Sequence, residues 1–414
     1  MKLNTQDREA IGKLTALAKQ SGLNVNGGMV CRTSSRFCFG VEHGDYNGTE
    51  LFGVGTDRFI WMGYKPNKTN RFRFYSGNFS GDGVVEFECG DNPNPRSPEI
   101  AKTWGRFAYG VDYILRREGF DLREGVDAVI YGNIPGGGMS RSASLTLNLI
   151  LSVLEANRIR VEDKFRIADM AQAVENDYIG SPCGLLDQIM ILFARAGVGV
   201  HFNPGERSVN YIPFGNDVHD FRIVGLDTGT DRPGLENSTY RIRRAECEQF
   251  VSLLQKAGYT IQNLANVRED LEYREIMDKF SSSHPNLCDR LKYIFFAQKR
   301  FYIMLDAWKR GDIATVGRIF REDGHSLRDD YKISGPELES MCNIARTVEG
   351  VYGERILGGG DKGASGALVA VDSVEALSKA VDVSYPKRHP EYKDKYAVHV
   401  FKMVDGIHLF DGVI

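Results

Sequence analysis

The sequence predicts a two-domain α+β protein, and three observations carry this prediction. First, the chain has 414 residues, of which 42% are hydrophobic and 26% charged, so it can bury a sizeable core. Second, segments typical of strands lie between residues 29 and 90, and helical patterns come after them. Third, residues 205–220 are rich in Gly, Pro, Asn and Asp, and long helical patterns follow. We therefore expect an N-terminal domain over residues 1–210 and a C-terminal domain over residues 211–414.

Strands and helices are both expected in the N-terminal domain. An amphipathic helix opens the chain and ends near Gly22. The strand-like segments FRFYSGNF and VVEFEC follow, with Gly-Asp turns between them. A helix is expected over residues 97–119, because Ser97-Pro98-Glu99 is a favourable helix start. Further along, the pattern predicts a strand at 125–132, helices at 145–157 and 161–178, and a turn leading into a helix within 179–197.

Helical patterns dominate the C-terminal domain. The apolar run FRIVGLD predicts a strand over residues 221–227. After it we expect helices at 239–258, 287–311 and 336–350, then a glycine loop at 357–366 and a strand at 367–372.

Charge, cysteine content and hydropathy restrict the partners and the location of the protein. The net charge of −3 gives no reason to expect a nucleic-acid or membrane-surface partner. The seven cysteines form no CxxC or zinc-type spacing, which favours reduced thiols. The N-terminal segment lacks the apolar core of a signal peptide, and no apolar run reaches the roughly 18 residues of a membrane span. We therefore expect a cytoplasmic protein with neither partner.

The turn NIPGGGMSRSAS, residues 133–144, is a candidate anion-binding element. It lies between a predicted strand and a predicted helix, and its glycines let the backbone approach a ligand closely. The first amides of a helix have no partner within the helix and favour negative charge, such as a phosphate. The alternative is a glycine turn with a serine cap. The patterns G-x-x-x-x-G-K-[ST] and strand-linked G-x-G-x-x-G are both absent, so a phosphate would need a different fold.

A dense group of polar side chains lies in SSRFCFGVEHGDYNG, residues 34–48. It contains Arg36, Glu42, His43 and Asp45. Carboxylates accept hydrogen bonds and histidine donates or accepts them, which suits the several hydroxyls of a sugar. The alternative is a polar hairpin closed by an Asp-Tyr-Asn-Gly turn. On a strand, Glu42 and His43 would point to opposite faces, which argues against a metal site.

Two further carboxylates stand at helix ends. Asp187 in SPCGLLDQ falls in the first turn of a predicted helix, where an acid stabilises the helix dipole. Glu175 falls near the end of its predicted helix, where an acid is slightly unfavourable. That position suggests a reason such as a bound cation.

Six segments, in order along most of the chain, resemble the galactokinase branch of the GHMP sugar kinases. They are VEHGDYNG (41–48), NIPGGGMSRSASL (133–145), VENDYIGSPCGLLDQ (174–188), STYRIRRAECE (238–248), GHSLRDDYKISGPELE (324–339) and ILGGGDKGASGALV (356–369). The glycine-rich segments are shared by the wider superfamily, whereas EHGDYN, CGLLDQ and HSLRDDY are much more specific. The resemblance implies a two-domain GHMP-kinase-like fold of mixed sheets and helices, with the active site in the interdomain cleft.

The resemblance also implies an activity and a catalytic pair. The implied enzyme uses ATP and Mg²⁺ to phosphorylate the C1 hydroxyl of a monosaccharide, with galactose as the leading substrate. By motif, Asp187 takes the hydroxyl proton or orients the hydroxyl, and Arg36 keeps that carboxylate ionised and offsets charge on the transferring group. Phosphoryl transfer depends mainly on positioning and charge neutralisation, which fits so small a catalytic set. We expect the protein to act as a monomer.

The binding residues that the resemblance implies fall into three groups. The sugar would contact Glu42, His43, Asp45, Gly184 and Tyr240. The ATP would contact Gly136, Gly137, Gly138, Ser140, Arg141, Ser142 and Trp104. The Mg²⁺ ion would be held by Glu175 and Ser142, whose oxygens suit a hard cation. Trp104 could equally be a core residue and Tyr240 a helix-face tyrosine, and His325 with its segment would brace the second domain.

The chain departs from the family pattern at three places. Thr33-Ser34-Ser35 precedes Arg36 where the family has A-P-G, the phosphate loop is one residue shorter, and Arg141 replaces a serine often assigned to Mg²⁺. Asp361 and Lys362 replace an apolar-glycine pair in the terminal loop, where Lys362 meets an anion or is a loop-tip lysine. Two alternatives follow. One is a sibling kinase for N-acetylgalactosamine, arabinose, a uronic acid, fucose or a heptose. The other is a non-catalytic sensor of ATP and sugar.

Overall fold

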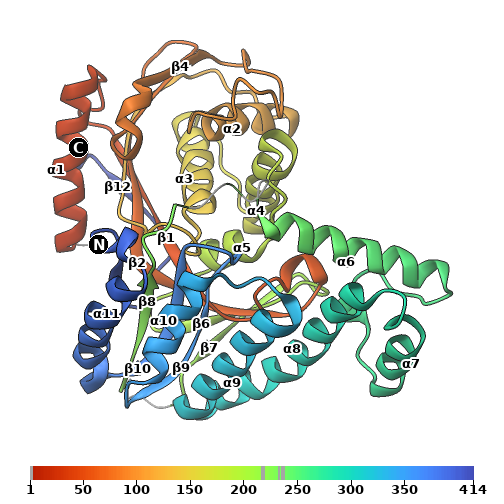
Figure 1. Ribbon diagram of the computed structural model, residues 1–414. Helices are drawn as coiled ribbons and strands as arrows, with labels where there is room; N and C mark the ends of the chain where they lie inside the picture. Colours follow the sequence, from red (N-terminus) through yellow and green to blue (C-terminus); the bar gives the residue numbers. More distant parts are fainter. Residues whose placement is uncertain (1–2, 216–219, 232–233, 235–237) are drawn as a thin grey trace.

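Two β-sheets organise the chain in the computed structural model, which describes residues 3–215, 220–231, 234 and 238–414 (Figure 1). The first sheet has the strand order β12-β1-β2-β5-β3-β4, with β6 paired to β2 and β7 to β6. The second sheet has the order β11-β8-β10-β9. The β3–β5 pair is parallel and the other pairs are antiparallel.

The bounds of the elements are as follows. The first sheet contains β1 (Met29–Gly40), β2 (Leu51–Pro66), β3 (Arg71–Ser76), β4 (Val84–Glu88), β5 (Val126–Gly132), β6 (Val198–Asn203), β7 (Ser208–Pro213) and β12 (Ile407–Asp411). The second contains β8 (Phe221–Asp227), β9 (Val351–Ile356), β10 (Ala364–Ala370) and β11 (Ala397–Phe401). The helices are α1 (Thr5–Ser21), α2 (Arg106–Arg117), α3 (Arg141–Ala156), α4 (Lys164–Ala173), α5 (Leu186–Leu192), α6 (Thr239–Lys256), α7 (Asp270–Phe280), α8 (Pro285–Arg310), α9 (Ile313–Ser326), α10 (Pro336–Arg346) and α11 (Val374–Arg388).

The first sheet is covered on both faces. Successive side chains of a strand point to opposite faces, and β1 follows this rule. Val30 packs with Leu14 of α1, whereas Cys31 belongs to the main core with Leu147 of α3. Figure 1 shows α1 on one side of this sheet and α3 on the other. Because α3 is held firmly against β1 and β2, the start of α3 has a fixed position.

The second sheet is also covered on both faces. One face packs against α10 and α11, where Val224 contacts a cluster that includes Met341 and Leu377. The side chains of Ile223 and Leu368 belong instead to the main core, which also contains residues of β1, α8 and α9. The main core therefore joins the two sheets. The division predicted at residue 210 stays a prediction; β7 spans it, and β12 returns to pair with β1.

The helix predicted over residues 97–119 starts late. Residues 97–105 form turns, and α2 begins at Arg106. The cause is a tertiary contact, because the Asp82 carboxylate accepts hydrogen bonds from the Thr103 hydroxyl at 3.0 Å and the Trp104 amide at 3.3 Å. The Thr103 hydroxyl in turn accepts the Gly105 amide. Side chains thus take the amides that a longer helix would use.

Candidate active site

A cavity of about 420 Å³ lies where β1, the starts of α3 and α5, and two glycine loops come together. Every residue that the sequence assigned to the site lines it, except Gly136. Those lining residues are Arg36, Glu42, His43, Asp45, Trp104, Gly137, Gly138, Ser140, Arg141, Ser142, Glu175, Gly184, Asp187 and Tyr240. A concave site with convergent polar groups is typical of a small-molecule site, although the individual roles stay predictions.

Arg36 and Asp187 form the centre of this site. The Arg36 Nε–H donates to Asp187 Oδ1 at 2.8 Å, and Arg36 Nη2 lies 2.7 Å from the same oxygen. The Arg36 Nη1–H donates to the carbonyl oxygen of Gly138 in the glycine loop at 2.9 Å. Burial alone would lower the pKa of Arg36, but the charges of Asp187 and Glu42 raise it above the ordinary value. The predicted proximity of Arg36, Asp187 and the glycine loop is confirmed.

Glu42 is buried and held by groups associated with both sheets. Its Oε1 accepts the amide of Gly358 at 2.9 Å and lies 3.3 Å from Arg355 Nη2 and 3.9 Å from Arg36 Nη1. Arg355 also donates to the carbonyl oxygens of Cys38 and Phe39 and pairs with Asp323 at 2.7 Å. The sequence pattern did not point to Arg355, because its contacts are made by residues distant in the chain. Glu42 therefore links the Arg36–Asp187 pair to the second sheet.

Asp45 faces a narrow space beside the start of α5. Its Oδ2 accepts the amide of Leu186 at 3.2 Å and its Oδ1 accepts the amide of Tyr46. A Cβ atom at Gly184 would lie 1.9 Å from Oδ2, so this position has no room for a side chain. Burial and the charge of Asp187 raise the pKa of Asp45 while the two amides lower it, and the net result is a pKa of about 6. The pKa of Asp45 is thus well above the ordinary value of an aspartate.

Aromatic side chains complete this half of the cavity. The His43 ring lies 5.2 Å from the Tyr240 ring, and His43 Nδ1 lies 2.9 Å from the Tyr46 hydroxyl. The Tyr46 hydroxyl also bonds that of Tyr331, which belongs to the SLRDDY segment. The assumption that Glu42 and His43 lie on a strand is wrong. They form a turn after β1 ends at Gly40, and His43 has a φ of 59°.

The glycine loop before α3 packs closely against the terminal glycine loop. Gly138 has a φ of 81°, and a Cβ there would lie 2.8 Å from the carbonyl oxygen of Leu357. Gly358 of the terminal loop packs directly against Gly138. Ser140 has a φ of 61°, and its buried hydroxyl has no hydrogen-bond partner among the residues that the structure describes. Small residues from both loops thus leave backbone and hydroxyl groups facing the cavity.

Gly136, the first glycine of this loop, does not line the cavity but contacts Asp227 of β8. Burial raises the pKa of Asp227, whereas the amides of Gly229 and Gly136 and the charge of Arg141 lower it. Arg141 lines the cavity at the first position of α3, with its guanidinium 5.9 Å from the Phe79 ring. Burial lowers the pKa of Arg141, and Asp227 opposes this effect. A cation at a helix N-terminus is unfavourable on its own, so an anion in the cavity would stabilise it.

Glu175 and Ser142 are the predicted metal ligands. Glu175 is 4% exposed and stands in a π-helical turn, Val174–Ile179, that continues α4. Such turns are frequent at functional sites. Glu175 and Ser142 both line the cavity, and carboxylate and hydroxyl oxygens suit a hard cation such as Mg²⁺. The buried Ser140 hydroxyl is a further oxygen of this kind.

Trp104 lines the cavity and also belongs to the core, being 5% exposed. Its Nε1–H is buried and has no hydrogen-bond partner in the described part of the chain. Around it the cavity is lined by residues that the sequence did not single out, namely Ser76, Asn78, Phe79, Asp82, Lys102, Thr103, Arg106 and Phe107. No single local motif marks these residues, because they come from the end of β3, the 3-10 segment Gly77–Asp82, the turns at 97–105 and the start of α2.

The two unusual residues of the terminal loop lie outside the cavity lining. The Asp361 carboxylate accepts the Thr239 amide at 2.8 Å, at the start of α6 beside Tyr240. Lys362 is half-buried and is not among the lining residues. Within the described ranges, no helix is long and apolar enough to cross a membrane.

Comparisons with known proteins agree with this fold. Residues 106–195 match the family model described as the GHMP kinases N terminal domain. The structure of Methanococcus jannaschii mevalonate kinase, 14% identical, superposes with a TM-score of 0.61 over 91% of this chain and 98% of that one. The fold is therefore that of a GHMP kinase, a class of phosphotransferases.

Two galactokinases narrow this class of protein. A galactokinase of Exiguobacterium sibiricum is 32% identical over 347 residues, which are 83% of this chain and 85% of that protein. The structure of Lactococcus lactis galactokinase with galactose, 25% identical, gives a TM-score of 0.87 over 97% of this chain and 99% of that one. The chain belongs to the galactokinase family.

Proposed function

We propose that this protein transfers the γ-phosphate of ATP to the C1 hydroxyl of galactose. The observation that carries the proposal is the Arg36–Asp187 pair, which stands between the glycine loop and the polar group of Glu42, His43 and Asp45. The cavity of about 420 Å³ is lined by this pair and this polar group as well as by Trp104. Names and bound sugar of the galactokinase relatives support galactose as the acceptor.

The reaction follows from this placement. Asp187 accepts the proton of the C1 hydroxyl as its oxygen bonds to the γ-phosphorus, and the bond from that phosphorus to the β–γ bridging oxygen breaks, which releases ADP. Arg36 neutralises charge that develops beside it. The glycine-loop amides and Arg141 hold the phosphates. Glu175 and Ser142, with Ser140 nearby, would hold Mg²⁺, which neutralises phosphate charge when bound.

Carboxylates and aromatic side chains line the half of the cavity that would hold the sugar. Asp45 and Glu42 offer carboxylate oxygens, and the Asp45 carboxylate lies close to Gly184, which has no side chain to displace it. Tyr240 would cover one face of the sugar ring, since its side chain is buried against His43 and Tyr46.

An ATP-consumption assay over a panel of monosaccharides tests the proposal. The panel includes galactose, N-acetylgalactosamine, arabinose, a uronic acid, fucose and a heptose, and NMR identifies the product. Turnover with galactose that yields galactose 1-phosphate is the expected result. Turnover only with another sugar would assign a sibling activity, and binding of sugar and ATP without ADP release would assign a sensor.

The cellular setting is part of the same proposal. The seven cysteines are unpaired thiols, of which only Cys89 is more than slightly exposed. Reduced thiols support a cytoplasmic enzyme. We infer a monomer, and light scattering coupled to gel filtration measures this directly.

A further inference from the structure

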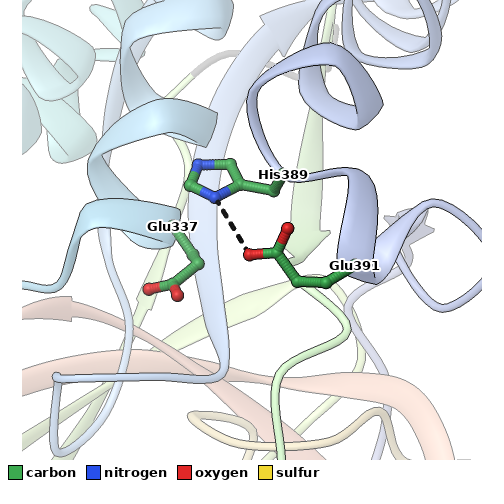
Figure 2. A group of neighbouring side chains, drawn as sticks. All are labelled: Glu337, His389 and Glu391. Atoms are coloured by element: carbon green, nitrogen blue, oxygen red, sulfur yellow. Dashed lines mark ion pairs between the residues drawn. The ribbon is translucent and has the colours of Figure 1, made fainter.

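Outside the cavity, three potential metal ligands gather at one end of the C-terminal domain (Figure 2). Glu337 stands in the first turn of α10, His389 follows α11 directly, and Glu391 lies in a short 3-10 helix, Pro390–Tyr392. One ligand atom from each residue lies within 4.8 Å of the other two. We propose that these three side chains bind a divalent transition-metal ion, with Zn²⁺ as the representative of the class.

The His389 ring is held in one orientation. Its Nε2 lies 2.8 Å from the hydroxyl of Ser340, and the ring packs 5.0 Å from that of Tyr385. Donation of the Nε2 proton to Ser340 leaves the Nδ1 lone pair facing Glu391, whose Oε1 is 3.9 Å away. Metal-binding histidines are commonly oriented in this way by a hydrogen bond to the other ring nitrogen.

The carboxylates of the cluster have no lysine or arginine partner. In the part of the chain that the structure describes, neither Glu337 nor Glu391 forms an ion pair with a lysine or arginine, and Glu391 pairs with His389. A divalent cation between the two carboxylates would neutralise their negative charge.

The geometry and the donor types suit a transition metal rather than Mg²⁺. Around a tetrahedral ion with bonds of about 2.0–2.2 Å, donor atoms lie roughly 3.4 Å apart. The separation of 3.9 Å between His389 Nδ1 and Glu391 Oε1 is close to this value. The Glu391 side chain is 57% exposed, so it is free to rotate toward the ion. An imidazole nitrogen with two carboxylates favours Zn²⁺ or Co²⁺ over Mg²⁺ or Ca²⁺.

The bound ion would connect α10 with the end of α11. Glu337 and Ser340 belong to the first turns of α10. Just before α10, the carbonyl oxygen of Ile333 accepts a hydrogen bond from the amide of Asp361. Asp361 itself caps α6 next to Tyr240. The site is thus a structural one, separate from the catalytic cavity.

Titration of the whole protein with Zn²⁺ and Co²⁺ in a Mg²⁺-containing buffer tests the proposal. Calorimetry is expected to show one Zn²⁺ site, and Co²⁺ is expected to give the visible absorption of a nitrogen- and oxygen-bound ion. Glu391→Gln and His389→Ala are each expected to abolish binding, and Ser340→Ala to weaken it by about tenfold to a hundredfold. Glu375→Gln, an 80% exposed acid on α11, is the matched control and retains the site.

Two results would overturn the proposal. One is an absence of Zn²⁺ binding to the parent protein. The other is an affinity that stays the same in Glu391→Gln and in His389→Ala, which would place the ion elsewhere. Glu391→Gln keeps the test valid if His389→Ala does not fold, because Glu391 is largely exposed.

Discussion

At the scale of single residues, the polar motifs and the family resemblance found the polar centre of the cavity, but not its remaining lining. Asp45 stands in a segment whose residue types suit a sugar site, whereas Gly184 and the role of Asp187 came from the resemblance; all three line the cavity. Arg355 was missed, because a buried arginine in a strand carries no local signal. Its importance arises only when Cys38, Phe39 and Asp323 approach it in space.

Replacement of Asp187 by Asn tests the predicted proton acceptor. We expect kcat to fall by about 10²- to 10⁴-fold, because an amide cannot take the hydroxyl proton. Thermal unfolding should change little, since the Asn oxygen still accepts the Arg36 Nε–H and the Asp187 side chain is 30% exposed. Steady-state kinetics measure kcat, and a thermal melt measures the unfolding temperature. Asp177→Asn, at a half-exposed carboxylate paired with Arg117, is the control and should leave kcat unchanged. Retained activity in Asp187→Asn would remove Asp187 from the mechanism.

The raised pKa of Asp45 predicts a pH dependence of sugar binding. Burial sets this pKa to about 6, so Asp45 is ionised above that pH and protonated below it. The protonated form loses an acceptor for sugar hydroxyls, and KM for galactose should therefore rise as the pH falls through 6. In Asp45→Asn, KM should be high at every pH and this inflection should be missing. An unchanged inflection in the variant would assign it to another group.

At the scale of elements, the error in the start of α2 shows the limit of local patterns. Ser97-Pro98-Glu99 is a good helix start, but Asp82 binds the groups that a helix there would need. A tertiary hydrogen bond overrides propensity in such cases. The helix predicted from residue 145 begins earlier, because α3 starts at Arg141 within the glycine-serine segment. The placement of Asp187 in the first turn of a helix is confirmed, since α5 begins at Leu186.

A second prediction at this scale concerns Gly184, which lies just before α5 and close to the turn that carries Asp45. Gly184→Ala should raise KM for the sugar by displacing the Asp45 carboxylate, because the added Cβ would lie 1.9 Å from its Oδ2. The kcat should change less than KM. Gly12→Ala is the matched control, since its Cβ would meet nothing within 4 Å on α1. The KM of Gly184→Ala would contradict the structure if it equalled that of the parent.

At the scale of the whole molecule, the two sheets meet through buried charges as well as through apolar packing. Arg355 of β9 reaches β1, Glu42 and Asp323, and its side chain has no exposed surface. The sequence indicated two domains, yet it could not predict this contact or the pairing of β12 with β1, because both join segments far apart in the chain.

Loss of Arg355 should therefore affect stability and activity together. Arg355→Met is expected to lower the free energy of unfolding by about 3–5 kcal/mol, because it leaves Asp323 and Glu42 buried without this partner. Arg318→Met, at an exposed pair with Glu322, is the control, with an expected change of about 0–1 kcal/mol. Denaturant unfolding of both variants gives these values. In Arg355→Lys, kcat should recover only in part, because an ammonium group cannot make all of the guanidinium contacts. Equal stability of the two methionine variants would contradict this account.

The pairing of Thr33 with Ile407 has a consequence for biosynthesis. A ribosome translates β1 early, yet the neighbour that closes one edge of this strand emerges only after nearly all the rest. Until then the nascent polypeptide presents an unpaired strand edge, which is a site where other chains can attach. Molecular chaperones that shield such edges during translation should therefore improve the yield of this enzyme.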